Sequence, residues 1–209
     1  MLFTNTVTAN TLELLKNLQS ENLLQDFNLV GGTALSFYFG HRKSIDLDLF
    51  TQNDFDTNEL LEFLEQKYNF KTDYLSKNTV KGSIKEVKVD FLSHKYPFAG
   101  NVIKESGLRL LSIEDIAAMK LNAISGNGTR SKDFIDIYFI LKQYSINDIL
   151  KFYELKYSSR NLLHAFKSLI YFDDINNLDW PEMILEKDLN FKTVKKEITK
   201  KVKLYNKQI

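Results

Sequence analysis

The sequence predicts an α+β fold in which a sheet-containing first half is followed by a helical second half. Before residue 100, several segments alternate apolar and polar residues as strands do, whereas from Ser112 onward nearly every segment repeats its apolar residues at helical spacing. Only 8 Gly and 2 Pro occur in 209 residues, which is typical of a compact domain rich in regular elements. We therefore expect a mixed sheet with helices over residues 1–100 and a helical domain over residues 101–209.

The first half combines helices and strands. Helices are expected where apolar side chains recur every three or four residues, over 9–19, 33–39 and 57–68. Gly40 is expected to stop the second of these helices, and Asp56 or Thr57 to cap the third. Strands are expected over 27–30, over the strictly alternating SIDLDLF segment (44–50), and over two or three segments between 70 and 94, of which 85–93 is the clearest.

The second half reads as consecutive helices. They are expected over 112–125, 131–144, 146–157, 158–171 and 188–205. Ser112 starts the first of them with a capping box. The stretch from Lys192 to Lys207 contains seven Lys and one Glu. Such a run is usually a solvated helix face, and the alternative is a set of phosphate contacts to a structured RNA.

Composition excludes several kinds of site and partner. Lys and Arg total 28 against 27 Asp and Glu, so a polyanionic partner would have to bind a local patch. The absence of Cys excludes disulfides, thiolate metal sites and Cys nucleophiles, and three His without ligand spacing disfavour a histidine metal site. The N-terminus does not resemble a signal peptide, and no apolar run approaches the length of a membrane span. We expect a cytoplasmic protein without membrane association.

Three carboxylates are placed to converge. Asp46 and Asp48 lie two residues apart on one predicted strand and so share a face, while Asp90 lies out of phase with the apolar residues of another strand. The apolar residues of the two strands are expected on the core face: Ile45, Leu47 and Leu49 on the first, and Val87, Val89 and Phe91 on the second. If the strands are neighbours, the acids raise each other's pKa values unless a cation lies between them, and they form a ligand set for two Mg²⁺ ions. The alternative is that they decorate the solvent face of a sheet.

A Gly-Gly-Thr turn precedes the paired acids. Gly31, Gly32 and Thr33 lie between a predicted strand and a predicted helix, where backbone N–H groups and the helix dipole can meet a phosphate. The alternative is a tight connection with no ligand.

The second half contains a lysine within an apolar helical stripe. Lys120 falls on one helix face with Ile113, Ile116, Ala117 and Ile124, and a buried lysine needs an anionic partner. The next helix offers two acids at i,i+3 spacing, Asp133 and Asp136. The sequence allows a buried ion pair that locks the two helices together, and it also allows a lysine that contacts a triphosphate. Two arginines, Arg42 and Arg130, can likewise contact a phosphate or remain exposed.

These motifs together resemble a known family. The segment LVGGTALSFYFGHRKSIDLDLF is similar to the first motif of the AbiEii/AbiGii toxin family of nucleotidyltransferases, which belongs to the DNA polymerase β superfamily. Asp90 matches the third carboxylate of that family, and MKLNAISGNGTRSKDFIDIYFIL resembles its later motif. The resemblance extends from about residue 29 to residue 142.

The resemblance implies a polymerase β-like nucleotidyltransferase core followed by a helical bundle that completes the active site. It implies two Mg²⁺ ions, with Mn²⁺ as a substitute, held by Asp46, Asp48 and Asp90. The catalytic residues would be these three acids with Lys120 and Asp133. The nucleotide-binding residues would be Gly31, Gly32, Thr33, Arg42, Ser44, Lys120, Arg130 and Asp136.

The resemblance also implies partners and a biological role. They are an NTP substrate, a tRNA or other RNA acceptor, a cognate antitoxin, and a role as the toxin of a toxin–antitoxin or phage-defence system. Two alternatives remain: the same chemistry on a protein or small-molecule hydroxyl, and a non-catalytic module that binds a nucleotide or RNA. Salt-sensitive tRNA binding distinguishes an RNA acceptor from a protein or small-molecule acceptor. The complete set of three carboxylates argues against a non-catalytic binding module.

Overall fold

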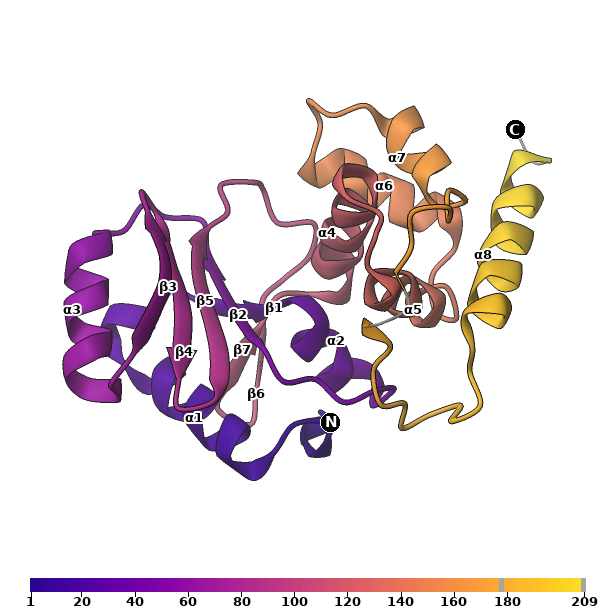
Figure 1. Cartoon of the computed structure of the whole chain (residues 1–209). Coiled ribbons are helices and arrows are strands. Elements are labelled where there is room, and N and C mark those ends of the chain that lie inside the picture. Colours follow the sequence, from indigo (N-terminus) through magenta and orange to yellow (C-terminus); the bar gives the residue numbers. More distant parts are fainter. Residues whose placement is uncertain (177–178, 208–209) are drawn as a thin grey trace.

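A seven-stranded mixed sheet forms the centre of the first half of the chain in a computed structural model, which describes residues 1–176 and 179–207 (Figure 1). The strand order is β3-β4-β5-β2-β1-β7-β6. The strands are β1 (Asn28–Val30), β2 (Leu47–Thr51), β3 (Lys71–Ser76), β4 (Thr79–Ile84), β5 (Val87–Ser93), β6 (Ile103–Glu105) and β7 (Leu108–Leu110). The expected α+β fold class is confirmed.

The strand pairing brings two of the predicted acids together. β2 pairs with β5 in parallel, and the register places Asp48 directly beside Asp90. On the opposite edge of β2, β1 pairs with it antiparallel and places Val30 beside Asp48. The Gly-Gly-Thr turn, which follows Val30, therefore begins next to the carboxylate pair.

Two features of the sheet differ from the sequence prediction. The β6-β7 hairpin extends the sheet to Leu110, past the boundary that we expected near residue 100, because β7 pairs in parallel with β1. The β2 strand begins at Leu47, whereas we expected residue 44. Ile45 therefore lies outside the sheet and is 65% exposed, so its expected place on the core face with Leu47 and Leu49 is wrong.

Eight α-helices accompany the sheet in the part of the chain that the structure describes, with short 3-10 turns at Thr4–Thr6 and Asn22–Leu24. They are α1 (Ala9–Ser20), α2 (Gly31–Phe39), α3 (Thr57–Tyr68), α4 (Ile113–Gly126), α5 (Ser131–Ile140), α6 (Ile146–Lys156), α7 (Leu162–Ser168) and α8 (Phe191–Asn206). Figure 1 shows α4 to α8 gathered at one side of the sheet. α2 contacts β1 and β2 on one side and α4 and α5 on the other, so it connects the sheet to the helical half.

Local capping explains most helix limits. Gly40 ends α2 in the left-handed conformation at φ 64°, and Asp56 caps α3, as the sequence predicted. α5 ends at Ile140, four residues earlier than expected, because Ser145 opens α6 with a capping box and the intervening residues form a turn. α7 is likewise shorter than the expected 158–171.

The core runs continuously from the sheet into the helical half. Its buried side chains include Leu29, Leu47 and Phe91 on the strands and Leu121 and Ile137 on the helices. Among the described residues, the helices lack the length and apolar character that a membrane crossing requires.

Candidate active site

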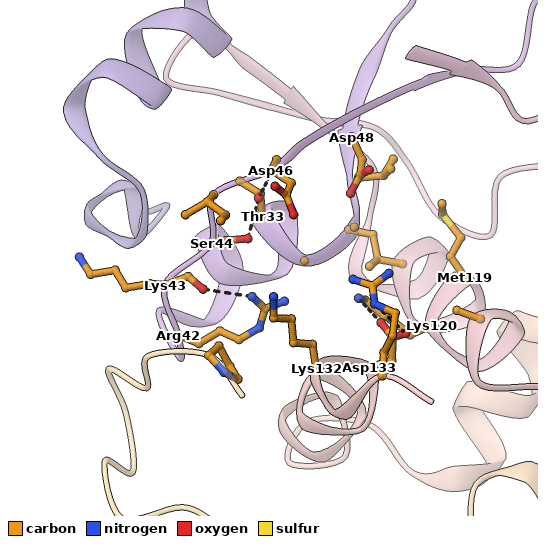
Figure 2. Close-up of a pocket in the computed structure, with 18 of the residues that line it drawn as sticks. Thr33, Arg42, Lys43, Ser44, Asp46, Asp48, Met119, Lys120, Lys132 and Asp133 are labelled. Atoms are coloured by element: carbon orange, nitrogen blue, oxygen red, sulfur yellow. Dashed lines mark hydrogen bonds and ion pairs between the residues drawn. The ribbon is translucent and has the colours of Figure 1, made fainter. Parts of the chain in front are cut away.

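A cavity of about 430 Å³ lies where the sheet meets the helical half. Its walls come from the start of α2, the segment leading into β2, the middle of α4, the start of α5 and a later segment at Pro181 and Glu182. Figure 2 shows Asp46 and Asp48 on one side of this space and Arg42, Lys120, Lys132 and Asp133 on the other. An acidic side and a predominantly basic side thus face each other across one cavity.

The start of α2 brings backbone and charges into close approach. Gly31 has φ 71°, and a Cβ atom there would lie 2.3 Å from Oδ2 of Asp48. A Cβ atom at Gly32 would lie 2.2 Å from Nη2 of Arg42. Position 31 therefore favours glycine through its left-handed backbone, and a side chain at position 32 would displace the Arg42 guanidinium. Among the described residues, no side chain caps α2, and the first residues of α2 line the cavity, so this helix start is available to bind an anion.

Thr33 and Ser44 hold the segment that carries Asp46. The Thr33 hydroxyl donates a hydrogen bond to the backbone carbonyl of Asp46 and lies 2.7 Å from Oγ of Ser44. Thr33 is buried, although it borders the cavity. These hydroxyls fix the position of Asp46 just before β2. The sequence predicted nucleotide binding for Thr33 and Ser44 and did not predict this contact.

The three predicted acids lie close together but differ in surroundings. Asp46 and Asp48 line the cavity, whereas Asp90 lies beside Asp48 on β5 with its carboxylate 2.9 Å from Nζ of Lys81. Burial, together with the neighbouring Asp90 and Asp46 charges, raises the pKa of Asp48 to about 6. Among the described residues, no group of three or more acidic or histidine side chains is already arranged as a metal site.

Asp136 is the hub of a buried ion-pair network behind the cavity. Its carboxylate accepts hydrogen bonds from Nε (2.8 Å) and Nη2 (3.0 Å) of Arg42 and lies 2.9 Å from Nε2 of His41. Nζ of Lys120 lies 2.7 Å from Oδ2 of the same carboxylate. Arg42 and Lys120 hold the pKa of Asp136 well below its usual range despite its complete burial, while burial lowers the pKa of His41. Asp136 does not line the cavity, so its part is to position the cations that do.

Asp133 occupies the cavity wall itself. Its carboxylate accepts a hydrogen bond from Lys120 at 2.7 Å, and the Arg130 guanidinium lies 4.0 Å away. The side chain of Arg130 is 60% exposed and borders the cavity. The buried ion pair that the sequence allowed for Lys120 is therefore present with both acids, and the same lysine still reaches the cavity wall. Arg42 is only 3% exposed, so it is not the exposed turn residue that one interpretation allowed.

A late segment of the chain completes the site. The Lys43 N–H donates to the Glu182 carbonyl at 2.8 Å, and the Ile184 N–H donates to the His41 carbonyl at 2.9 Å. Asp179 accepts hydrogen bonds from the backbone N–H (3.2 Å) and hydroxyl (2.6 Å) of Ser131, at the start of α5. Sequence reasoning missed this strap over 179–185, because its contacts are distant in the chain and it has no periodic pattern. It also missed Lys132, whose proximity to Asp133 was the only signal available.

Comparisons with known proteins identify the family. The model of the AbiEii nucleotidyl transferase toxin, of type IV toxin–antitoxin systems, matches residues 13–106 and 86–204. The chain belongs to the AbiEii nucleotidyltransferase toxin family. It is 32% identical over 168 residues to an uncharacterized protein of Aquifex aeolicus (strain VF5), covering 78% of this chain and 81% of that protein.

Solved structures agree on the fold. A candidate nucleotidyltransferase from H. pylori superimposes with a TM-score of 0.58 at 19% identity and covers 96% of each chain. The antibiotic-resistance factor ANT(2'')-Ia gives a TM-score of 0.52 at 14% identity, covering 69% of this chain and 88% of that one. Family membership identifies the chain as a nucleotidyltransferase, and the solved structures share its α+β architecture.

Proposed function

We propose that this protein transfers a nucleotide from an NTP to an RNA acceptor, with tRNA as the first candidate, in a reaction that needs a divalent metal. The observation that carries the proposal is the cavity in which Asp46 and Asp48 face Arg42, Lys120 and Lys132 beside the uncapped start of α2. A metal-bound triphosphate is complementary to this arrangement, because its anionic phosphates need both a helix start and cations, and its metal needs carboxylates.

The donor set fits a hard divalent cation. Burial, with the charges of Asp90 and Asp46, raises the pKa of Asp48, and a cation bound beside these acids would favour the ionised form of Asp48. Asp46, Asp48 and Asp90 would hold the metal, with Asp90 exchanging its ion pair with Lys81. When bound, Mg²⁺ or Mn²⁺ supplies charge neutralisation for the triphosphate and makes the acceptor hydroxyl more acidic.

The residues of the chain have separate tasks in the transfer. The N–H groups at Gly31 and Gly32, with Arg42, Lys120 and Arg130, bind and orient the phosphates. The acceptor hydroxyl oxygen forms a bond to the α-phosphorus, the bond from that phosphorus to the bridging oxygen breaks, and pyrophosphate leaves. The hydroxyl proton passes to a carboxylate beside the attacking oxygen, for which Asp90 is the candidate.

A lysine stripe on α8 supports an RNA acceptor. The buried face of α8 carries Val194, Ile198 and Val202. Its exposed lysines at three- and four-residue spacing form one stripe along the helix: Lys192, Lys196, Lys200, Lys203 and Lys207. The nearly neutral net charge of +1 means that this stripe is a local positive patch, and such a patch fits a phosphate backbone.

In the cell, we propose the role of a toxin in a toxin–antitoxin or phage-defence system. Family membership supports this role and implies a cognate antitoxin as partner.

The test is transfer of label from each α-³²P NTP to total tRNA, with Mg²⁺ or with EDTA. We expect labelled tRNA with the wild-type protein and Mg²⁺, and no labelled tRNA with EDTA or with Asp48→Ala. If the protein binds Mg²⁺ and NTP but labels only a protein or small-molecule hydroxyl, the RNA acceptor is wrong. If NTP does not bind at all, the proposal as a whole is wrong.

A further inference from the structure

A second cavity of about 450 Å³ lies behind the loop that joins α4 to α5. Its lining comes from the end of α4 and the following loop on one side, and from α7 and residues 171 and 174 on the other. Its polar and aromatic side chains include Ser125, Asn127, His164, Lys167 and Tyr171.

This cavity adjoins the cavity that lies beside Asp48. Ala123 lines the first cavity and Ile124 lines the second one, and on the far side of the loop Thr129 lines the second and Arg130 the first. Consecutive residues are about 3.8 Å apart, so the two cavities share the end of α4 and the loop after it. The two cavities are therefore neighbours along this stretch of the chain.

The chemistry of the second cavity differs from that of the first. It contains one lysine and one aspartate, so its charges balance, whereas the first carries a cluster of cations for phosphates. Two rings are available at its walls: Tyr171 is 52% exposed, and His164 is fixed by its Nε2 atom, 3.0 Å from the Ser125 carbonyl. Hydroxyl and amide groups lie beside them. Aromatic rings together with neutral hydrogen-bonding groups favour a planar base and its ribose over a phosphate chain.

We propose that this second cavity binds a nucleoside. The nucleoside belongs either to the end of the acceptor RNA or to the NTP whose phosphates occupy the first cavity. The choice between these two sources rests on the proposed function, whereas nucleoside binding itself can be measured without any transfer.

Gly126 offers a way to block the cavity without disturbing the fold. It lines the cavity, a Cβ atom added to it meets no atom within 4 Å, and its backbone is not in the left-handed region. Gly126→Phe therefore fills the cavity from its wall. Tyr171→Ser removes a ring instead, so the two variants change the site in independent ways. Tyr74→Ser is the matched control, because Tyr74 is 55% exposed on β3, away from both cavities.

The first measurement is binding of adenosine, guanosine, cytidine and uridine to the full chain by ligand-observed NMR. We expect at least one nucleoside to bind the wild type and the Tyr74→Ser control equally. Its affinity should fall roughly 5- to 100-fold in Tyr171→Ser, as the loss of one stacking contact predicts, and at least as much in Gly126→Phe, because the added ring occupies the cavity. The proposal is overturned if no nucleoside binds, or if both variants bind as the wild type does.

The second measurement identifies the source. Steady-state transfer kinetics of Gly126→Phe should show a raised KM for the RNA if the cavity holds the acceptor end, and a raised KM for the NTP if it holds the nucleotide. Unchanged KM values for both substrates would overturn the proposal. If the wild type transfers no nucleotide, the proposed function fails, and the binding measurement alone then decides this inference.

Discussion

Asp48 combines burial with two acidic neighbours, Asp90 and Asp46, and both features make its ionised form unfavourable. Its pKa is about 6 in the folded protein against an ordinary value of 3.8. The folded state therefore binds the proton more tightly than the unfolded state. The destabilisation caused by ionised Asp48 is fully present above pH 6 and disappears as the pH falls toward 4.

We predict that Asp48→Asn stabilises the metal-free protein at pH 8 by about 1–3 kcal/mol. The gain should shrink toward zero as the pH falls from 6 to 4, because the wild-type carboxyl then becomes neutral too. Urea denaturation of both proteins across this pH range measures the difference. A gain that is independent of pH would contradict the prediction, and added Mg²⁺ should stabilise the wild type more than the variant.

Asp136 and Asp133 contact the same lysine, but we predict different roles for them. Asp136→Ala leaves Arg42 and Lys120 buried without their shared partner and should cost about 3–5 kcal/mol of stability. Asp133→Ala is the control. Lys120 keeps its ion pair with Asp136 in this variant, so the loss of stability should be about 1–2 kcal/mol. Because Asp133 lines the cavity, we also expect this variant to have a raised KM for NTP. Chemical denaturation gives the stabilities, and equal losses would contradict this division of roles.

At the scale of elements, one buried pair joins the sheet to the helices. Asp115 of α4 lies 2.7 Å from Nζ of Lys156 at the end of α6, and both side chains are fully buried. The Asp115 carboxylate also accepts hydrogen bonds from the backbone N–H groups of Ala99 (2.9 Å) and Gly100 (3.1 Å). It therefore fixes the connection between β5 and β6 against both helices.

We predict that Asp115→Ala destabilises the protein by about 3–5 kcal/mol, because Lys156 is left as an uncompensated buried charge. Adding Lys156→Met in the same chain should recover most of that loss. Glu21→Ala is the control, since it breaks a partly exposed pair with Lys67 and should cost less than about 1 kcal/mol. Thermal and urea unfolding test all three, and a double variant no more stable than the single one would refute the explanation.

The helices and strands show which features of the fold can be predicted from the sequence alone. Periodicity predicted most helices and the longer strands, and the phase of Asp90 predicted that it faces away from the apolar side of its strand, because these signals are local. That the two strands are neighbours, with Asp90 beside Asp48, comes from the structure. β6 and β7 have three residues each, too few to show alternation. The pairing of Arg42 with Asp136 and the strap over 179–185 join segments far apart in the chain, which a single sequence does not encode in any local pattern.

The whole molecule has a net charge of +1, so its attraction for RNA depends on where the charges lie. We predict that replacing Lys196, Lys200 and Lys203 of the α8 stripe with Gln weakens tRNA binding. The slope of log K against log salt concentration should fall by about 2–3, because each lost phosphate contact removes nearly one unit.

Fluorescence anisotropy with labelled tRNA at several salt concentrations measures this effect. A triple Gln variant of Lys16, Lys71 and Lys88 is the control, since these exposed lysines lie outside the helical half and the change in net charge is identical. Equal effects of the two triple variants would show that general charge, and not the stripe on α8, governs binding.

We propose that the site beside Asp48 catalyses transfer of the nucleotidyl group of the NTP to the acceptor, and not transfer of its terminal phosphoryl group. The most direct test compares α-³²P and γ-³²P forms of the same NTP, with the wild type and Asp48→Asn, in the presence of Mg²⁺ and tRNA. We expect label on the acceptor from the α-form only and the γ-label in pyrophosphate. Both signals should be lost in Asp48→Asn. Label from the γ-form on the acceptor, or undiminished transfer by Asp48→Asn, would contradict this proposal.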